Sequence, residues 1–186
     1  MHVRAWKLLV GAALVSVLGA IVWWAYSYDP REFHGAAPMR DTGVFTYYRY
    51  HATLGEVPLA SSGTYTLRFS GMPATAMVLQ FYVAGGSDAN RKLFESLTTE
   101  LTAEIVDSRG NVVCVATGTP SATDPLRRWV LMSSLSEAAY WHERCRSVTF
   151  ARNTDYTLRV DIRNVDPRSP PVALTVTLQG GGIELS

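Results

Sequence analysis

The sequence is poor in the residues that most often carry chemistry. It has two cysteines, four histidines and only two lysines among its 186 residues. No second cysteine or histidine stands at metal-ligand spacing beside Cys114, so the spacing predicts neither a metal site nor a cofactor. The chain also lacks a Gly-x-Ser-x-Gly nucleophile motif and a phosphate-binding glycine loop ahead of a helix. We therefore expect no catalytic residues.

One short stretch remains as a candidate for chemistry. It contains His142 and Glu143, and Cys145 follows two residues after Glu143. A zinc-protease motif needs a second histidine four residues after the first, and position 146 is an arginine. We interpret the stretch as a solvated loop, with half of a metal site or an acid–base pair as the alternative. His34 and His51 lie in separate segments and are expected at the surface.

Positive charge is not in excess either. Of the 17 basic residues, Arg4 and Lys7 precede the first apolar run, which leaves 15 basic against 16 acidic residues after it. The resulting charge of −1 gives no electrostatic support to nucleic-acid binding, which needs a basic surface. No internal repeat or second long apolar run is present, so the remainder is interpreted as one domain.

The one long apolar run covers residues 8–26 and contains no charge. As a helix it would extend roughly 28 Å, close to the thickness of the hydrocarbon core of a bilayer. The basic residues before it predict a cytoplasmic N-terminus. The aromatic residues expected at the membrane interface are Trp23, Trp24, Tyr26 and Tyr28. We therefore predict a single-pass protein of the bacterial inner membrane whose C-terminal domain is periplasmic.

A cleaved secretory signal is the alternative interpretation of the same run. Residues 25–27 have the small-x-small form of a cleavage site, which would place the cut before Tyr28. Against it, the run is longer than the apolar region of a signal peptide, usually about 7–15 residues. We favour the uncleaved anchor. Residues 1–28 then form the cytoplasmic tail and anchor, 29–43 a stalk, and 44–186 the periplasmic domain.

Cys114 and Cys145 are expected to form a disulfide, because an exported domain folds in an oxidising compartment. Closing a loop of about thirty residues would stabilise the fold by roughly 3–4 kcal/mol in the chain-entropy model. Two buried free thiols are the alternative.

Short alternating segments dominate the exported part. Tyr65, Leu67 and Phe69 alternate with polar residues, which is typical of a half-buried strand. Further strands are predicted at residues 44–50, 77–83, 101–107, 112–117, 128–132, 156–163 and 172–179. One short helix is predicted within residues 87–101, with Ser87 as its cap. The pattern predicts a mainly β protein, an antiparallel β-sandwich with one short helical insertion.

Several connections between these strands are also predicted. Gly110 is expected to supply the positive φ of a tight turn between residues 101–107 and 112–117. Residues 55–63 are expected to form a loop, and the glycines at 180–182 a flexible exit. The last two strands are expected to pair with each other in antiparallel fashion, with one face buried and one in water.

The order of these parts resembles a bacterial envelope family catalogued as domain of unknown function 5625. The matching pieces are QFYVAGGSDANRKLFESL, then LTAEIVDSRGNVV, then YTLRVDIRNVDPRSPPVALTVTL, and together they span most of residues 64–178. Family members resemble exported lipoproteins or anchored proteins, so the resemblance implies an envelope location and the fold, and no site residues. This chain departs from the family by lacking a lipid-bearing cysteine after the apolar run.

Aromatic residues crowd two places in the domain. The candidates for binding are Tyr47, Tyr48, Trp129 and Trp141, because exposed rings stack on sugars or anchor protein interfaces. We predict a non-catalytic binding domain that engages a protein partner, as a component of an envelope complex or as an immunity-type protein. Carbohydrate or cell-wall binding is the first alternative, and a hydrolase with dispersed active-site residues the second.

Overall fold

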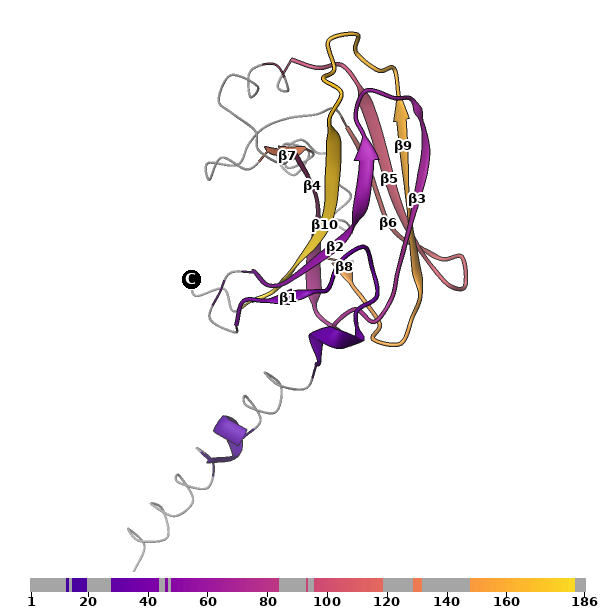
Figure 1. The fold of residues 1–186 in the computed structure, drawn as a ribbon. Coiled ribbons are helices and arrows are strands. Elements are labelled where there is room, and N and C mark those ends of the chain that lie inside the picture. Colours follow the sequence, from indigo (N-terminus) through magenta and orange to yellow (C-terminus); the bar gives the residue numbers. More distant parts are fainter. Residues whose placement is uncertain are drawn as a thin grey trace, which may run out of the picture.

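The computed structural model describes residues 13, 15–19, 28–43, 46, 48–83, 93, 96–118, 129–131 and 148–182. These residues form two antiparallel β-sheets that face each other (Figure 1). The alternation of apolar and polar residues in the sequence is the cause, since it gives each strand one face to bury. The predicted antiparallel, mainly β sandwich is confirmed at this level.

The first sheet has the strand order β1-β2-β10-β4-β7, and β8 also pairs with β4. Its strands are β1 (Arg40–Asp41), β2 (Tyr48–Pro58), β4 (Ala76–Val83), β7 (Trp129–Leu131), β8 (Val148–Thr149) and β10 (Ala173–Gly181). β10 lies between β2 and β4 and pairs with both. Its inward-facing Leu174, Val176 and Leu178 are fully buried, so the closing strand of the chain forms the centre of this sheet.

The second sheet has the strand order β3-β9-β5-β6. Its strands are β3 (Gly63–Phe69), β5 (Glu100–Asp107), β6 (Val112–Gly118) and β9 (Tyr156–Arg163). Burial alternates along β9, where Leu158 and Val160 are buried and Arg159 is exposed. β5 and β6 form the predicted hairpin, and Gly110 in its turn has a φ of 83°. One face of this sheet therefore lines the core and the other faces water.

A single hydrophobic core lies between the two sheets. The first sheet contributes Leu79 and Phe81, and the second contributes Ile105 and Leu158, all of them at most 1% exposed. Burial of this apolar surface is the main favourable term that holds the sheets together.

The pairing predicted for the last two strands is wrong. β9 pairs with β3 and β5, whereas β10 pairs with β2 and β4. The connection between them, residues 164–172, therefore crosses from one sheet to the other. Alternation specifies which residues face the core, but it does not specify which neighbour a strand takes when two sheets share that core.

β2 begins and ends later than the sequence predicts. It begins at Tyr48 and continues through Gly55 to Pro58, although Gly55 was expected to open a loop. A register shift against β10 makes Leu54 the extra residue of a β-bulge. A Cβ added to Gly55 would lie 2.7 Å from the side chain of Leu67. The glycine therefore marks a bulge and a close contact between sheets, not the end of the strand.

Residues 28–43, which we name the entry segment, pack against the sandwich where a stalk was expected. Phe33 and Met39 are 5% and 6% exposed. Pro30–Glu32 form one 3-10 turn, η1, and Arg40–Asp41 form β1 at the edge of the first sheet. His34 and Ser70 exchange two backbone hydrogen bonds of 3.0 and 3.1 Å. Large apolar side chains within a polar segment are the reason, because a spacer would leave them in water.

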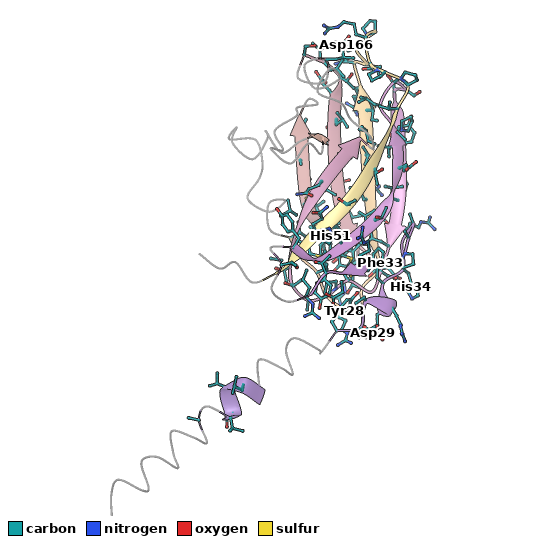
Figure 2. All side chains as sticks on the ribbon, turned by 60° about the vertical axis from the view of Figure 1, so that its left-hand side comes forward. Tyr28, Asp29, Phe33, His34, His51 and Asp166 are labelled. Atoms are coloured by element: carbon teal, nitrogen blue, oxygen red, sulfur yellow. The ribbon has the colours of Figure 1, made fainter. Side chains whose placement is uncertain are left out.

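The sandwich has two ends with different residues (Figure 2). We name the end that holds Tyr28, Phe33 and His34 the entry end, and the end that holds Asp166 the far end. β2, β4 and β9 begin at the entry end, and β10 ends there.

The predicted transmembrane helix lies mostly outside the described residues. Within the run, Ala13 and residues 15–19 are helical, and Val15, Val17 and Leu18 are exposed. Across the part of the chain that the structure describes, no helix has the length and apolar character needed to cross a bilayer. The anchor therefore stays a prediction.

The predicted helical insertion also lies largely outside the described residues. Leu93 is helical and Leu97 is buried, but residues 97–99 have no regular structure and Glu100 already belongs to β5. The helix therefore does not extend to residue 101, because Leu101 pairs with Ile162 in the second sheet.

Candidate binding cleft at the entry end

A cleft of about 170 Å³ opens where the chain enters the sandwich. Its residues come from the entry segment, the start of β2, the loop before β4, the connection before β9 and the end of β10. They are Tyr28, Arg49, Tyr50, Pro73, Ala74, Thr75, Arg152 and Gly181. Segments that are far apart in the sequence therefore meet at one cleft.

Two tyrosines and two arginines are among the residues that line the cleft. The ring centroids of Tyr28 and Tyr50 lie 5.2 Å apart with an interplanar angle of 80°, an edge-to-face contact. The Arg49 guanidinium lies 4.6 Å from the Tyr50 ring centroid, and that of Arg152 lies 5.7 Å from the Tyr28 centroid. Each ring thus carries one cation at a distance that favours cation–π attraction.

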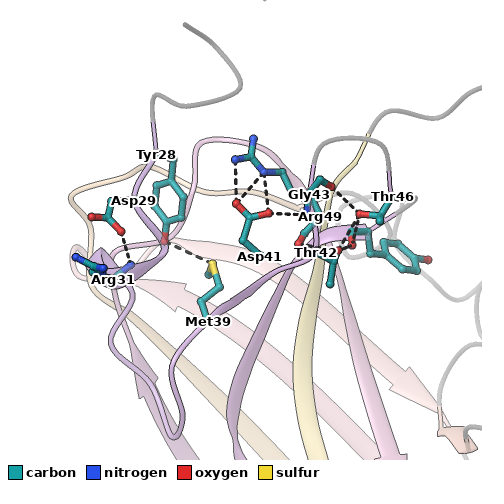
Figure 3. Close-up of polar contacts among 10 residues, drawn as sticks. Tyr28, Asp29, Arg31, Met39, Asp41, Thr42, Gly43, Thr46 and Arg49 are labelled. Carbon is teal, nitrogen blue, oxygen red and sulfur yellow. Dashed lines mark hydrogen bonds and ion pairs between the residues drawn. The ribbon is translucent and has the colours of Figure 1, made fainter. Parts of the chain in front are cut away.

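Each arginine also binds a carboxylate. Arg49 donates from Nε to both oxygens of Asp41 at 3.1 Å and from Nη2 to Oδ2 at 2.9 Å (Figure 3). Arg152 donates from Nε to Glu32 Oε2 at 2.7 Å. Neither carboxylate is among the described residues that line the cleft. The described walls therefore carry two positive charges and no negative charge.

The two ion pairs differ in burial. The side chains of Arg49 and Asp41 are 6% and 25% exposed, whereas those of Arg152 and Glu32 are 42% and 36% exposed. Burial alone would raise the pKa of Asp41, but the hydrogen bonds from Arg49 and the Gly43 amide lower it overall. The bond from Arg152 lowers the pKa of Glu32. The buried pair is fixed, and the exposed pair exchanges more readily with other charged groups.

The two phenol groups of the cleft differ in their partners. Tyr28 Oη donates to the Gly71 carbonyl oxygen at 2.5 Å and lies 3.6 Å from Met39 Sδ. Tyr50 is only 4% exposed, yet no hydrogen bond joins its hydroxyl to any residue that the structure describes. A buried hydroxyl without a partner costs on the order of 1–3 kcal/mol, and buried tyrosines usually find one. The Tyr50 hydroxyl is therefore available to a bound group.

The groups in the cleft are suited to donating hydrogen bonds. Burial raises the pKa of both Tyr28 and Tyr50 above the usual value of about 10, so both phenols are protonated at neutral pH. The guanidinium groups of Arg49 and Arg152 have donors only, and Thr75 adds a hydroxyl. Donors of this kind match an oxyanion such as a carboxylate or a phosphate.

Two consecutive glycines shape the cleft. Gly181 has a φ of 75°, and a Cβ there would lie 2.7 Å from the Tyr50 ring and 3.0 Å from the Thr75 methyl group. At Gly180 a Cβ would lie 2.1 Å from the Ala76 carbonyl oxygen. Both glycines belong to β10, although a flexible exit was expected at 180–182. They allow β10 to approach β4 closely and leave the cleft open.

Tyr28 was expected at the membrane interface, and the structure buries it in the domain instead. It is 8% exposed, and its hydroxyl bonds to the domain. The ring is buried within the entry end, and its place relative to a membrane stays a prediction. The other predicted interface residues, Trp23, Trp24 and Tyr26, lie outside the described residues and stay predictions.

Of the four predicted binding residues, only Tyr48 has a described side chain. It is half-buried and lies edge-on to His51, with ring centroids 6.4 Å apart. Tyr48 does not line the cleft. The backbone of Trp129 forms part of β7, whereas its side chain, Tyr47 and Trp141 lie outside the described residues. Their binding roles stay predictions.

The predicted disulfide is described at one half only. Cys114 is fully buried in β6 and is not a free thiol. Cys145 lies outside the described residues, so the pairing stays a prediction.

The two histidines that the structure describes, His34 and His51, do not form a common site. His51 Nε2 lies 3.0 Å from the Tyr48 carbonyl oxygen, and His34 is exposed in its bridge to Ser70. His142 and Glu143 lie outside the described residues. Within the described ranges, no three histidine, cysteine or acidic side chains are placed to hold a metal ion.

The sequence did not point to Arg49, Tyr50 or Arg152 as site residues. A weak signal existed for Arg49, because a charge flanked by aromatic residues within a strand must find a partner or reach water. Arg152 follows Phe150 in a loop and gave no signal, because its position beside Tyr28 depends on the tertiary fold.

Comparison with known proteins adds no relative to this picture. No family model, curated protein or solved structure matches the chain. The resemblance to the envelope family described above therefore stays a prediction.

Proposed function

We propose that this chain is a non-catalytic, membrane-anchored interaction domain of the bacterial envelope, and that it binds a protein partner through the edge strand β3. The observation that carries the proposal is the place of β3 in the second sheet (Figure 1). β3 pairs with β9 on one side, and no described strand lies on its other side. A free edge offers backbone donors and acceptors to an added strand.

The side chains of β3 also suit this role. Thr64, Thr66 and Arg68 are exposed, whereas Tyr65 and Leu67 are half-buried and pack against the core. The strand contains no proline and no lysine, the residues that often protect edges from pairing. A partner strand would find seven residues of regular backbone here.

The entry segment supports the orientation. Tyr28 is buried only two residues after the apolar run of the predicted anchor ends at residue 26. In this proposal the entry end faces the membrane directly, without a stalk. β3 runs along the length of the sandwich from the far end to the entry end, so most of its edge stands clear of the bilayer.

Site-specific photo-crosslinking in native membranes tests the proposal. A photoreactive residue at Thr66 or at Arg68 is expected to capture one protein of defined mass in the full-length chain. The matched control is the exposed Ser108 in the β5–β6 turn, which is expected to capture none. Absence of a discrete protein adduct at both β3 positions, or an equal adduct at Ser108, contradicts the proposal.

A further inference from the structure

We propose that the cleft at the entry end binds a phosphate group, and that a membrane phospholipid supplies it through its headgroup. The choice of a lipid rests on the proposed function, because that orientation turns the entry end toward the bilayer. The phosphate chemistry itself rests only on the residues of the cleft.

The first argument is the Tyr50 hydroxyl. Tyr50 lines the cleft and is 4% exposed, and no described residue forms a hydrogen bond with its hydroxyl. Its neighbour Tyr28 uses its own hydroxyl on the Gly71 carbonyl oxygen. The Tyr28 hydroxyl therefore has a structural role. The Tyr50 hydroxyl has a donor that an acceptor oxygen of a bound group would satisfy.

The second argument is the charge of the wall. Arg49 and Arg152 line the cleft, whereas Asp41 and Glu32, which bind them, are not among its described lining residues. Arg49 is held by two bonds from Nε and one from Nη2 to Asp41, so it acts as a fixed charge. Arg152 lies in an exposed pair with Glu32, and its guanidinium lies 5.7 Å from the ring centroid of Tyr28, which lines the same cleft. Guanidinium groups match the oxygens of a phosphate in geometry and charge.

The third argument is size and position. A volume of about 170 Å³ admits a compact group and not an extended chain. Gly181 keeps this space open, because a Cβ there would lie 2.7 Å from the Tyr50 ring. Tyr28 in the cleft wall lies two residues beyond the predicted span, which places the cleft at headgroup depth in the proposed orientation.

Native mass spectrometry of the full-length protein in detergent tests the proposal. The probes are dihexanoylphosphatidylglycerol, inorganic phosphate and dihexanoylglycerol, which lacks the phosphate. We expect the phospholipid to bind at one copy per chain and dihexanoylglycerol not to bind. Tyr50→Phe is expected to weaken phospholipid binding about tenfold. Tyr65→Phe removes a hydroxyl that bonds to Ser61 outside the cleft, and it is expected to bind like the parent.

A second pair of variants tests the charge. Arg152→Gln is expected to weaken binding about tenfold, and added salt is expected to weaken binding to the parent protein. Arg159→Gln is the matched control, because Arg159 forms a similar exposed pair with Glu104 on the outer face of the second sheet. It is expected to leave binding unchanged.

The outcomes separate this inference from the function proposed above. Tighter binding of the phospholipid than of inorganic phosphate supports both the phosphate site and its lipid source. Equal binding of the two supports the phosphate site and contradicts the lipid source. No binding of either, or full binding by Tyr50→Phe and Arg152→Gln, overturns the proposal. Crosslinking at Thr66 is expected to be the same in all of these variants. A failure of the proposed β3 interface would therefore be detected by crosslinking, separately from any failure of phosphate binding.

Discussion

The two ends of the sandwich are held together by different kinds of interaction. At the entry end, aromatic rings contact one another: the centroids of Phe150 and Tyr156 lie 4.9 Å apart, and those of Phe69 and Tyr156 lie 5.5 Å apart. Tyr28 and Tyr50 form a second edge-to-face pair beside the entry segment. This end is stabilised mainly by the shape and burial of large rings.

At the far end, a single carboxylate organises the connections. Asp166 is 3% exposed and accepts hydrogen bonds from the side chain of Arg168 at 2.7 and 3.0 Å. It also accepts from the Thr98 amide at 3.1 Å and the Thr98 hydroxyl at 3.2 Å. These bonds hold the loop before β5 against the crossover between the sheets. The Arg168 hydrogen bonds keep the pKa of Asp166 well below its usual range.

The difference predicts how each end fails. Substitutions that remove an aromatic ring, or that add a side chain where the packing is close, are expected to destabilise the entry end, because close packing tolerates neither. The far end will respond to changes that remove the charge of Asp166 while leaving its size unchanged. Substitutions of matched size therefore separate the two mechanisms.

The largest effect is expected from Tyr28→Ala. The substitution removes a ring that is 8% exposed together with its hydrogen bond to the Gly71 carbonyl, and we expect a loss of roughly 4 kcal/mol. Tyr28→Phe keeps the ring and is expected to lose about 1 kcal/mol. Urea unfolding of the full-length protein in detergent measures both. Equal losses for the two variants would show that the ring itself contributes little.

Gly71→Ala is expected to be the next largest. Gly71 has a φ of 67°, and a Cβ there would lie 1.8 Å from the Glu32 carbonyl oxygen, so the entry segment would have to move. We expect a loss of roughly 3 kcal/mol. Gly110→Ala is the matched control, because Gly110 has a similar φ of 83° but nothing within 4 Å, and about 1 kcal/mol is expected. The same unfolding measurement compares them, and similar losses would contradict the close contact.

Much of the fold could be predicted from the sequence. Alternation located β3, β5, β6 and β9 because one face of each strand is buried and the other meets water. The partners of β9 and β10 could not be predicted, since both strands show the same pattern and belong to different sheets. Gly55 was misinterpreted because a glycine in a bulge looks like a glycine in a loop.

The candidate cleft was much harder to predict. Its residues come from five segments, and only Tyr28 had been singled out, for a different role. Phe33 and Met39 were the available warning that the entry segment packs against the domain, because a solvated spacer rarely carries two large apolar residues. The pairing of Arg152 with Glu32 joins residues 120 positions apart and has no local signature.

Asp166→Asn tests the far end without changing its volume. The neutral amide has one acceptor oxygen in place of two and no negative charge, so it cannot form the two-oxygen ion pair with Arg168, and the loops it joins are expected to loosen. We expect the melting temperature to fall by roughly 5 °C. Asp161→Asn is the matched control, since Asp161 pairs with the exposed Arg163 on the outer face of the second sheet. It is expected to change the melting temperature by about 1 °C or less.

The smallest effects are expected from pH, and they differ between the ends. The lowered pKa of Asp166 means that its contribution is present above about pH 4 and is lost as the pH falls further. The raised pKa of Tyr28 and of Tyr50 means that their contribution is present below about pH 10 and is lost as the pH rises further. Asp41 and Glu32 have lowered pKa values, so the entry end also weakens in acid. Alkali is therefore expected to act more strongly on the entry end than on the far end.

Methyl NMR of the full-length protein follows each end separately. Met39 reports on the entry end and Leu174 on the far end, and both are buried. As the pH rises above about 10, the Met39 signal is expected to broaden because ionisation of the phenols favours opening of the entry end, while the Leu174 signal keeps its position. In Tyr28→Phe the Met39 change is expected to shrink, because the phenol that lies 3.6 Å from Met39 Sδ and ionises when the entry end opens is gone. A Leu174 signal that moves together with that of Met39 would mean that the two ends unfold as one unit, so that the difference in their packing has no separate consequence for stability.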